Sequence, residues 1–115
     1  TIFSRDKLLD LAKTGVILEW DLFGHESSYY PFSDNSMPND SQRIDQIMFL
    51  IEEGFGDQIV ISHDICTKHR LVRYGGHGFS HILENVMPRM KLMGISEAEI
   101  EKMLISTPRR VLTFV

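Results

Sequence analysis

The sequence predicts an α/β fold built around two parallel strands that belong to a larger domain. Patterns typical of helices and strands alternate along the 115 residues in the order α–β–α–β–α–α–α. The strand patterns Val16–Gly24 and Ile59–Asp64 are nearly continuous apolar runs, which is typical of strands covered on both faces in a parallel sheet. Two such strands with four or five helices cannot close a sheet. We therefore expect the C-terminal part of a larger α/β domain, because helices follow the last strand.

A helix is predicted at the start of the chain, directly before the first strand. Apolar residues recur at helical spacing from Ser4 to Thr14, with Ser4 as the predicted N-cap and Gly15 as the residue that ends the helix. This helix would pack one face on the sheet. The residues of that face are Leu8, Leu9, Leu11 and Ala12.

A long polar segment and a second helix follow the first strand. The segment His25–Asn39 contains Tyr29-Tyr30 and is longer than the usual connection of about 4–6 residues, which favours a functional loop. Asn39 or Asp40 then caps a helix that runs through Glu53. The apolar face predicted for this helix consists of Ile44, Ile47, Met48 and Ile51.

A second long loop and a third helix follow the strand Ile59–Asp64. The loop carries basic residues and then a glycine-rich run that ends at Gly78. The helix is predicted from about Ser80 to Met93, where Gly94 ends it. Pro88 lies inside this helix and therefore predicts a kink.

Two further helical segments complete the chain. Ser96 and Glu99 form a capping box that opens a helix extending to about Ile105. Thr107-Pro108 fits an N-cap with proline at the first helical position, so a separate short helix is expected through Phe114.

The composition limits the class of protein and of partner. With 43% hydrophobic and 24% charged residues, the chain is globular rather than disordered. A formal net charge of -4 gives no electrostatic case for nucleic acid or an anionic membrane, and no apolar run approaches the roughly 20 residues of a membrane span. The lone Cys66 and the lack of a signal-peptide pattern favour a reducing, cytoplasmic compartment. Because the chain starts at Thr1, we expect either processing or a piece of something larger.

Two aspartates lie at the C-terminal ends of the predicted strands. Asp21 and Asp64 each follow a run of apolar residues, at the end of a parallel sheet that holds the active site in many α/β proteins. A carboxylate there can meet a metal, a base or a hydrogen-bond donor, or it can simply cap the following loop. The spacing alone leaves both interpretations open.

The chain resembles the phosphotriesterase-related branch of the amidohydrolase superfamily over essentially its whole length. The resemblance is carried by the strand-end aspartate with its glycine-rich loop, by the earlier strand end and by the closing helices. The matching residues are Ile59–Leu71, Tyr74-Gly75-Gly76-His77-Gly78, Phe79–Leu83, Asp21-Leu22-Phe23-Gly24, and Ile95-Ser96 through Thr107-Pro108.

The resemblance implies a (β/α)8 barrel, also called a TIM barrel, of which this chain supplies strands 7 and 8 with their flanking helices. Residues 1–115 would then be the C-terminal fragment of a single TIM-barrel hydrolase domain. Because such a barrel needs about 250 residues, the rest of the barrel is an expected partner. A homo-oligomer is compatible with this expectation.

The resemblance also implies a metal-dependent hydrolase. In the family two divalent metal ions, usually zinc, share a hydroxide that attacks a small ester or amide: an N-acyl amide, a carboxyl ester or a phosphotriester. Asp64 is implied as a metal ligand and as the catalytic residue that takes the proton from the hydroxide. The family's other ligands, a His-x-His pair, a bridging carboxylate and two histidines, belong to strands outside this chain.

Further site residues follow from the same resemblance. The glycine-rich loop borders the substrate pocket in the family, so Tyr74, Gly75, Gly76 and His77 are expected to bind substrate. Asp21 is expected to support the site by orienting neighbouring groups. Bacterial phosphotriesterases have a proton-relay histidine where this chain has Leu22, so a relay of that kind is not expected here.

The remaining histidines and the cysteine are interpreted as structural. Strand alternation points His63 away from the barrel axis, and the histidine spacing matches no zinc pattern. Cys66 is interpreted as a small buried thiol rather than a nucleophile. Since Asp64 is the one metal ligand in the chain, the alternative function is a non-catalytic truncated barrel that acts as a structural or interaction module.

Overall fold

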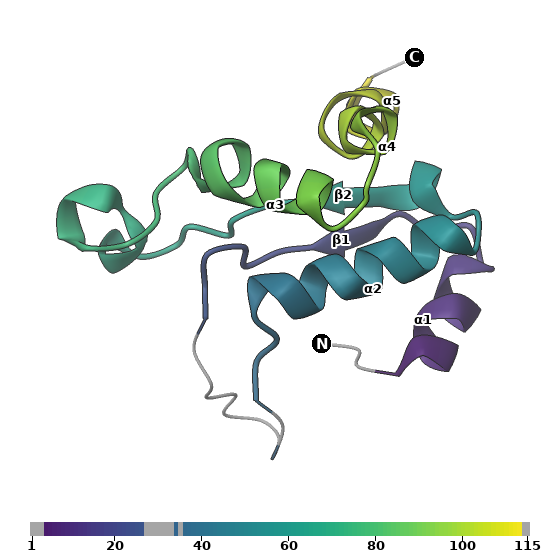
Figure 1. The fold of residues 1–115 in the computed structure, drawn as a ribbon, viewed down its shortest axis with the longest axis horizontal. Helices are drawn as coiled ribbons and strands as arrows, with labels where there is room; N and C mark the ends of the chain where they lie inside the picture. The colour runs from purple at the N-terminus through teal and green to yellow at the C-terminus, as the bar shows by residue number, and fades with distance from the viewer. Residues whose placement is uncertain (1–3, 27–33, 35, 114–115) are drawn as a thin grey trace.

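Two short parallel strands lie between helices in this computed structural model, which describes residues 4–26, 34 and 36–113 (Figure 1). Tyr29-Tyr30 and Phe114 lie outside the described residues. The elements are α1 (Arg5–Ala12), β1 (Leu18–Trp20), α2 (Asp40–Glu52), β2 (Ile59–Ile61), α3 (Met87–Leu92), α4 (Glu97–Glu101) and α5 (Thr107–Leu112). The predicted order of helices and strands is confirmed through α3, and the two helices predicted after it form one continuous helical segment.

The two strands pair in parallel over three residues each. Leu18 pairs with Ile59, Glu19 with Val60 and Trp20 with Ile61. Two backbone hydrogen bonds continue the pairing past the strands, from Ser62 N to Trp20 O (2.9 Å) and from Phe23 N to Ser62 O (3.2 Å). In Figure 1, α2 lies below this pair while α4 and α5 lie above it.

Within the described residues only one face of the strands is covered. Leu18 and Trp20 are buried on the helix side, and the Trp20 indole donates a hydrogen bond from Nε1 to Gln46 on α2 (2.9 Å). Glu19, on the opposite face, is exposed, and its partner Val60 is only half-buried. The strands are also shorter than predicted, Leu18–Trp20 and Ile59–Ile61, although the hydrogen bonds of Ser62 continue their pairing.

Both predicted helix starts before β2 lie at the expected positions. Ser4 has an extended backbone at the start of α1, although its side chain makes no capping hydrogen bond within the described residues. Asn39 caps α2, because its side chain accepts a hydrogen bond from Gln42 N and the Gln42 side chain accepts one from Asn39 N. The buried face of α2 contains Ile44 and Ile47 as predicted, together with Leu50.

The predicted kink at Pro88 takes the form of a π-helical turn. This turn spans Ile82–Val86 and leads directly into α3. Proline lacks an N–H group, and its ring clashes with the carbonyl four residues earlier, which here is Glu84. Glu84 is the central residue of the turn. The wider turn therefore relieves the clash while the helix continues.

The separate C-terminal helix predicted at Thr107-Pro108 is not found. Ser96 accepts from Glu99 N (3.2 Å) and opens α4 as expected, and a second π-helical turn, Lys102–Ser106, then joins α4 to α5 without a break. Leu104 is the central residue of this turn and precedes Pro108 by four. The Thr107 hydroxyl, instead of capping a helix, donates to the Asp57 carbonyl (3.1 Å).

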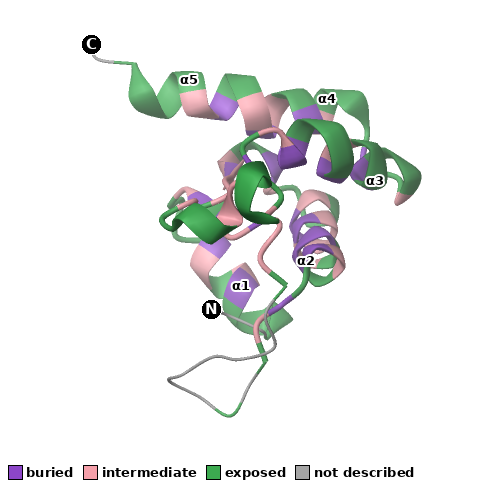
Figure 2. Cartoon of the chain, turned by 90° about the vertical axis from the view of Figure 1, so that its left-hand side faces the viewer, coloured by how far each residue is buried: buried purple, intermediate pink, exposed green. Residues whose placement is uncertain are grey.

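One apolar core joins the strands and the helices. Buried residues gather on the sides of α2, α3 and α4 that face the middle of the molecule (Figure 2). None of the helices described in the structure has the length and apolar character that crossing a membrane requires. The fully buried side chains include Ile44, Ile47, Leu50, Ile59, Met90 and Met103.

Candidate functional site

The two strand-end aspartates lie at the same edge of the sheet. The parallel register brings the segments after Trp20 and Ile61 side by side. The pKa of Asp21 is raised, first by burial and then by the negative charges of Asp64 and Glu19. The Asp64 charge therefore lies near enough to disfavour ionisation of Asp21.

The chain turns sharply at both strand ends. Leu22 and Asp64 are the two described residues other than glycine with positive φ, at 64° and 46°. Aspartate adopts this left-handed conformation more easily than most residues, whereas leucine rarely does. Non-glycine residues in such conformations cluster at functional sites.

Asp64 presents a carboxylate that is half exposed. Its backbone carbonyl accepts a hydrogen bond from Arg70 Nη1 (2.5 Å), and the same nitrogen lies 3.9 Å from Asp64 Oδ2. The Asp64 side chain is 50% exposed, and the Arg70 side chain is 18% exposed. A carboxylate in this position can accept a proton or bind a cation, and Arg70 is the charged side chain placed beside it.

The glycine-rich loop forms one wall of a hollow of about 360 Å³. Gly75, Gly76 and His77 line the hollow, but Tyr74 does not; its side chain is largely exposed. Gly76 cannot be replaced without rearrangement, because a Cβ at this position would lie 2.2 Å from the Arg70 carbonyl carbon. The other lining residues are Phe23, Gly24, His25, Glu26, His63, Ile65, His69, Arg70 and Gly78.

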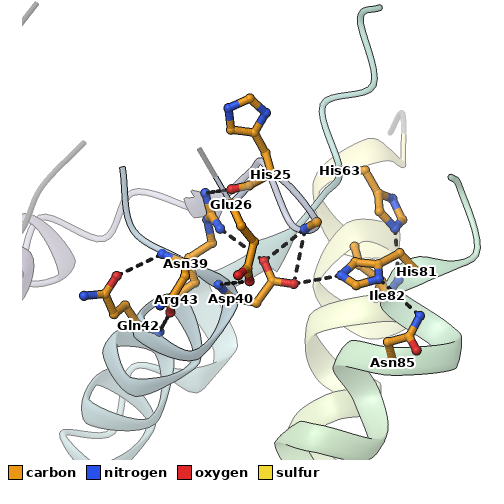
Figure 3. Close-up of polar contacts among 11 residues, drawn as sticks. His25, Glu26, Asn39, Asp40, Gln42, Arg43, His63, His81, Ile82 and Asn85 are labelled. Atoms are coloured by element: carbon orange, nitrogen blue, oxygen red, sulfur yellow. Dashed lines mark hydrogen bonds and ion pairs between the residues drawn. The ribbon is translucent and has the colours of Figure 1, made fainter. Parts of the chain in front are cut away.

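A buried carboxylate that sequence reasoning missed lies behind this wall. Asp40 is 4% exposed and accepts hydrogen bonds from Gly24 N (3.0 and 3.2 Å), Arg43 Nη1 (3.1 Å) and His81 Nε2 (2.7 Å) (Figure 3). Its own backbone N donates to Glu26 Oε1 (3.0 Å). Asp40 therefore ties the loop after β1 to α2 and to the helix that contains α3.

His81 completes this buried network from the far side. The residue is 6% exposed, and the Asn85 carboxamide nitrogen lies 3.2 Å from His81 Nδ1. When that amide donates to Nδ1, the proton of the neutral ring is on Nε2 and is donated to Asp40. His77 stacks on His81 with ring centroids 4.2 Å apart, so the network also supports a residue that lines the hollow.

Gly24 fits tightly against these rings. Its φ is 84°, and a Cβ there would lie 3.0 Å from His81 Cδ2 and 3.1 Å from His77 Cβ. Glycine therefore lets the backbone approach both the buried carboxylate and the histidine rings. The i,i+3 spacing of Asp40 and Arg43 could have suggested their ion pair, but no local pattern signals a partner 41 residues away.

His63 has the structural role expected for it. Its Nε2 accepts a hydrogen bond from Ile82 N (3.0 Å) at the start of the helical segment that leads to α3 (Figure 3). The pKa of His63 is lowered, first by burial and then by the neighbouring His81, with the Asp40 carboxylate opposing. The neutral ring that this hydrogen bond requires is therefore favoured.

Cys66 is exposed, so the expectation of a buried thiol is wrong. It lies on the loop after β2. The half-buried Ile65 next to it lines the hollow instead.

A complete metal site is not assembled by the described part of the chain. These residues contain no group of three or more histidine, cysteine, aspartate or glutamate side chains that could hold a metal ion. Asp64 offers a suitable oxygen ligand by its chemistry and exposure, but a single carboxylate does not retain a catalytic metal. The chain fits a metal centre only as the donor of one ligand.

A second, larger hollow of about 460 Å³ runs along the outer side of β1. Asp21 and Leu22 line it, but the glycine-rich loop does not, and Asp64 lines neither hollow. Its walls are mainly apolar and include Leu11, Val16 and Trp20. We therefore assign the candidate chemistry to the smaller hollow, which contains the polar side chains beside Asp64.

The family model described as the phosphotriesterase family matches residues 1–112. The chain is 58% identical over 116 aligned residues to the N-acetyltaurine hydrolase of Dictyostelium discoideum and 50% identical over 115 residues to that of Mus musculus. The alignments cover 100% and 99% of this chain but 31% and 33% of those proteins. The chain thus spans about a third of the length of the curated relatives it matches.

Solved structures give the same result. The chain superposes on a resiniferatoxin-binding protein from Rhodobacter sphaeroides with a TM-score of 0.87 and 31% identity, covering 94% of this chain and 30% of that one. The chain also superposes on the phosphotriesterase homology protein of Escherichia coli, solved with phosphate in its active site, with a TM-score of 0.80 and 27% identity. This match covers 95% of this chain and 34% of that one. These neighbours are TIM-barrel proteins, and each is covered only in part.

Proposed function

The chain belongs to the phosphotriesterase family, and on that premise we propose that the protein containing it is a metal-dependent hydrolase of small amides or esters. The observation that carries this proposal is the half-exposed Asp64 carboxylate, held in a left-handed turn after β2 and beside the end of β1. In this proposal β1 and β2 are strands 7 and 8 of a (β/α)8 barrel. The C-terminal ends of barrel strands carry the active site in such enzymes.

An N-acyl amide or a carboxyl ester is favoured over a phosphotriester as the substrate. The relatives from D. discoideum and M. musculus carry the name N-acetyltaurine hydrolase, and this chain shares half or more of its residues with them. A lactonase from Listeria monocytogenes is among the structural neighbours, with a TM-score of 0.78 and 28% identity. Carboxylic acid derivatives are thus the substrate class that the names of these relatives support.

Asp64 is proposed as a metal ligand and as the group that accepts the proton released when the nucleophile attacks. Two divalent ions, zinc in our proposal, would lower the pKa of bound water and so supply a nucleophile near neutral pH. The Asp64 carboxylate can hold the proton at one oxygen and return it to the leaving group. Asp21 is proposed to orient these groups, since its own charge is disfavoured beside Asp64.

The complete protein carrying Asp64→Asn tests this proposal. Asparagine keeps the size of aspartate but cannot accept the proton and binds metal weakly, so kcat should fall by about 10²–10⁴, with a further loss from reduced metal content. Turnover of an N-acyl amide, a lactone and a phosphotriester should be measured together with zinc content. Asp21→Asn is the matched control, and it should lower kcat less than Asp64→Asn does.

Two outcomes would contradict the proposal. Near-normal turnover and zinc content in Asp64→Asn would remove the role of that residue. If the complete wild-type protein hydrolysed none of the three substrates, the hydrolase itself would be refuted, and a non-catalytic interaction module would become the better interpretation.

A further inference from the structure

His77 is the residue of the glycine-rich loop that brings an imidazole ring to the smaller hollow. The backbone on either side of it is held by hydrogen bonds from Gly76 N to Leu71 O (3.1 Å) and from Gly78 N to Arg70 O (2.9 Å). These bonds fix where the His77 side chain begins but leave its rotamer open. The direction of the ring therefore depends on contacts outside its own loop.

Two other parts of the chain confine the His77 ring. Its centroid lies 4.2 Å from that of His81, and the two ring planes are inclined by 36°. Gly24, on the loop after β1, lies so close that a Cβ there would be 3.1 Å from both Cβ and Cδ2 of His77. His63 is farther from His81, with ring centroids 6.4 Å apart. His77 is thus the ring that the face of His81 supports.

The His81 ring is itself held rigidly from both of its nitrogens. Nε2 lies 2.7 Å from Asp40 Oδ2, and the Asn85 carboxamide nitrogen lies 3.2 Å from Nδ1 (Figure 3). Asp40 in turn accepts hydrogen bonds from Gly24 N and Arg43 Nη1. A rotation of the His81 ring would break one of these contacts inside the protein, where a lost hydrogen bond is costly. His81 is therefore a fixed surface on which another ring can be placed.

The two histidines differ in what they offer to a ligand. His81 is buried, does not line the hollow, and uses both nitrogens within the protein. His77 is exposed, lines the hollow, and has no hydrogen bond from its side chain to another described residue. A neutral imidazole has one donor and one acceptor, which match the C=O and N–H groups of an amide.

We propose that His77 contacts the substrate of the hydrolase and that His81 is the positioning residue that sets the direction of the His77 ring. This inference rests on the proposed hydrolase function. His77 forms one hydrogen bond with the bound substrate and takes part in no covalent step. His81 acts on the reaction through the contact between the two ring faces, while its bond to Asp40 stabilises the fold.

Two substitutions separate the two contacts of His81. In His81→Gln the side-chain amide replaces the Nε2 donor, so the bond to Asp40 is kept and the ring face is lost. In His81→Phe the ring face is kept, but the buried Asp40 loses a donor. In the complete, metal-loaded protein His81→Gln should unfold at nearly the wild-type urea concentration but lose activity. His81→Phe should unfold at a lower urea concentration and retain more kcat/KM than His81→Gln.

The reverse order of activity would overturn the proposal. If His81→Phe lost more kcat/KM than His81→Gln under conditions where both are folded, the bond to Asp40 would carry the effect, and the ring contact would not.

A double-mutant cycle tests whether His81 acts through His77. With an N-acyl amide, a lactone and a phosphotriester as probes, His77→Ala and His81→Gln should each lower kcat/KM about 10-fold, the value of one hydrogen bond. The combined variant should be no worse than His77→Ala, because His81 then has no ring to position. Losses that multiply to about 100-fold would overturn the proposal.

His69→Gln is the control for this cycle. His69 lines the same hollow, and no ring contact joins it to His81 among the described residues. Its effect on kcat/KM, whatever its size, should multiply with that of His81→Gln. A control pair as non-additive as the His77 pair would overturn the specific link between His81 and His77.

NMR of the histidine ring protons in the complete protein separates this inference from the proposed function. The His77 resonances should move in His81→Gln, which lacks the ring, and stay closer to the wild type in His81→Phe. If the wild type shows this pattern but hydrolyses none of the three probes, the positioning of His77 is supported, and its contact with a substrate is refuted together with the hydrolase. If the wild type is active and the His77 resonances do not move in His81→Gln, the positioning is refuted and the hydrolase stands.

Discussion

The loops after β1 and β2 leave the sheet at the same edge and with the same left-handed turn, but they are held in different ways. The loop after β1 is anchored by the buried carboxylate of Asp40, which binds the backbone of Gly24 and pairs with Arg43 and His81. The loop after β2 is anchored mainly by its own backbone hydrogen bonds, such as Gly78 N to Arg70 O (2.9 Å).

The loop after β1 therefore has a structural role, whereas the loop after β2 carries the candidate chemistry. The charges that anchor the first loop are almost inaccessible to solvent, whereas Asp64 and His77 on the second loop are exposed. A buried charge that loses its partner is expensive, while an exposed charge costs little when it is removed. The two strand ends should therefore respond in opposite ways to substitution, one in stability and the other in activity.

Replacing Asp40 should give the largest loss of stability. Asp40→Ala leaves the Arg43 guanidinium, which is 2% exposed, without its carboxylate, and breaking a buried pair in this way costs about 3–5 kcal/mol. Asp64→Ala at the other strand end should change stability by no more than about 0.5 kcal/mol. Urea unfolding of the complete protein measures both.

Asp45→Ala serves as the control on the same helix, since Asp45 lies on its exposed face. It should behave like Asp64→Ala. Equal losses for Asp40→Ala and Asp64→Ala would show that the two loops are not anchored differently.

Two glycines with similar backbone conformations test how tightly the Asp40 network is packed. Gly24 and Gly15 have nearly the same φ, 84° and 82°, but no atom lies within 4 Å of a Cβ built at Gly15. Both alanine variants should lose about 1–2 kcal/mol from the left-handed backbone. Gly24→Ala should lose about 1–3 kcal/mol more, because its methyl group meets the His77 and His81 rings.

The same unfolding experiment tests this expectation. The difference between the two glycine variants isolates the crowding against the buried network from the cost of the backbone conformation. If Gly24→Ala were no worse than Gly15→Ala, the network would be looser than these distances indicate.

The smallest expected effect is a pH dependence at Asp21. Its folded-state pKa is raised above the ordinary value of 3.8, so the folded protein holds the proton more tightly than the unfolded chain. Stability is therefore lost as pH rises from the ordinary value through the raised pKa. Asp21→Asn should be more stable than wild type above this window and equal to it below.

Unfolding of the metal-depleted complete protein across this pH range measures the effect. Asp64→Asn should remove part of the same dependence, because the Asp64 charge contributes to the raised pKa of Asp21. A stability difference between Asp21→Asn and wild type that does not vary with pH would contradict the interaction between the two strand ends.

The order of the elements and the position of Asp64 could be predicted because their signals are local. Apolar runs mark β1 and β2, and the capping residues Asn39 and Ser96 mark two helix starts. Alternation of helix and strand is enough to predict parallel pairing, which the register confirms.

The features that the sequence did not predict depend on contacts between residues far apart in the chain. The Asp40–His81 pair joins residues 41 apart, and an aspartate at a helix start has the same sequence pattern whether it is buried or exposed. Thr107-Pro108 has the pattern of a helix start, but the helix before it continues because a π-helical turn accommodates the proline. The exposure of Cys66 likewise depends on packing that the local sequence does not contain.

The π-helical turn centred on Glu84 couples chain length to the orientation of His81. Each residue added to a helix rotates the residues before it by about 100° about the helix axis. The extra residue of this turn therefore sets the direction in which the His81 side chain points relative to the buried Met90. Pro88 requires the wider turn, and the wider turn accommodates the extra residue, so a change to one of them should be matched by a change to the other. Deleting Leu83 alone should rotate His81 away from Asp40, whereas the same deletion combined with Pro88→Ala should keep the pair as an ordinary α-helix, which a structure of each variant would reveal.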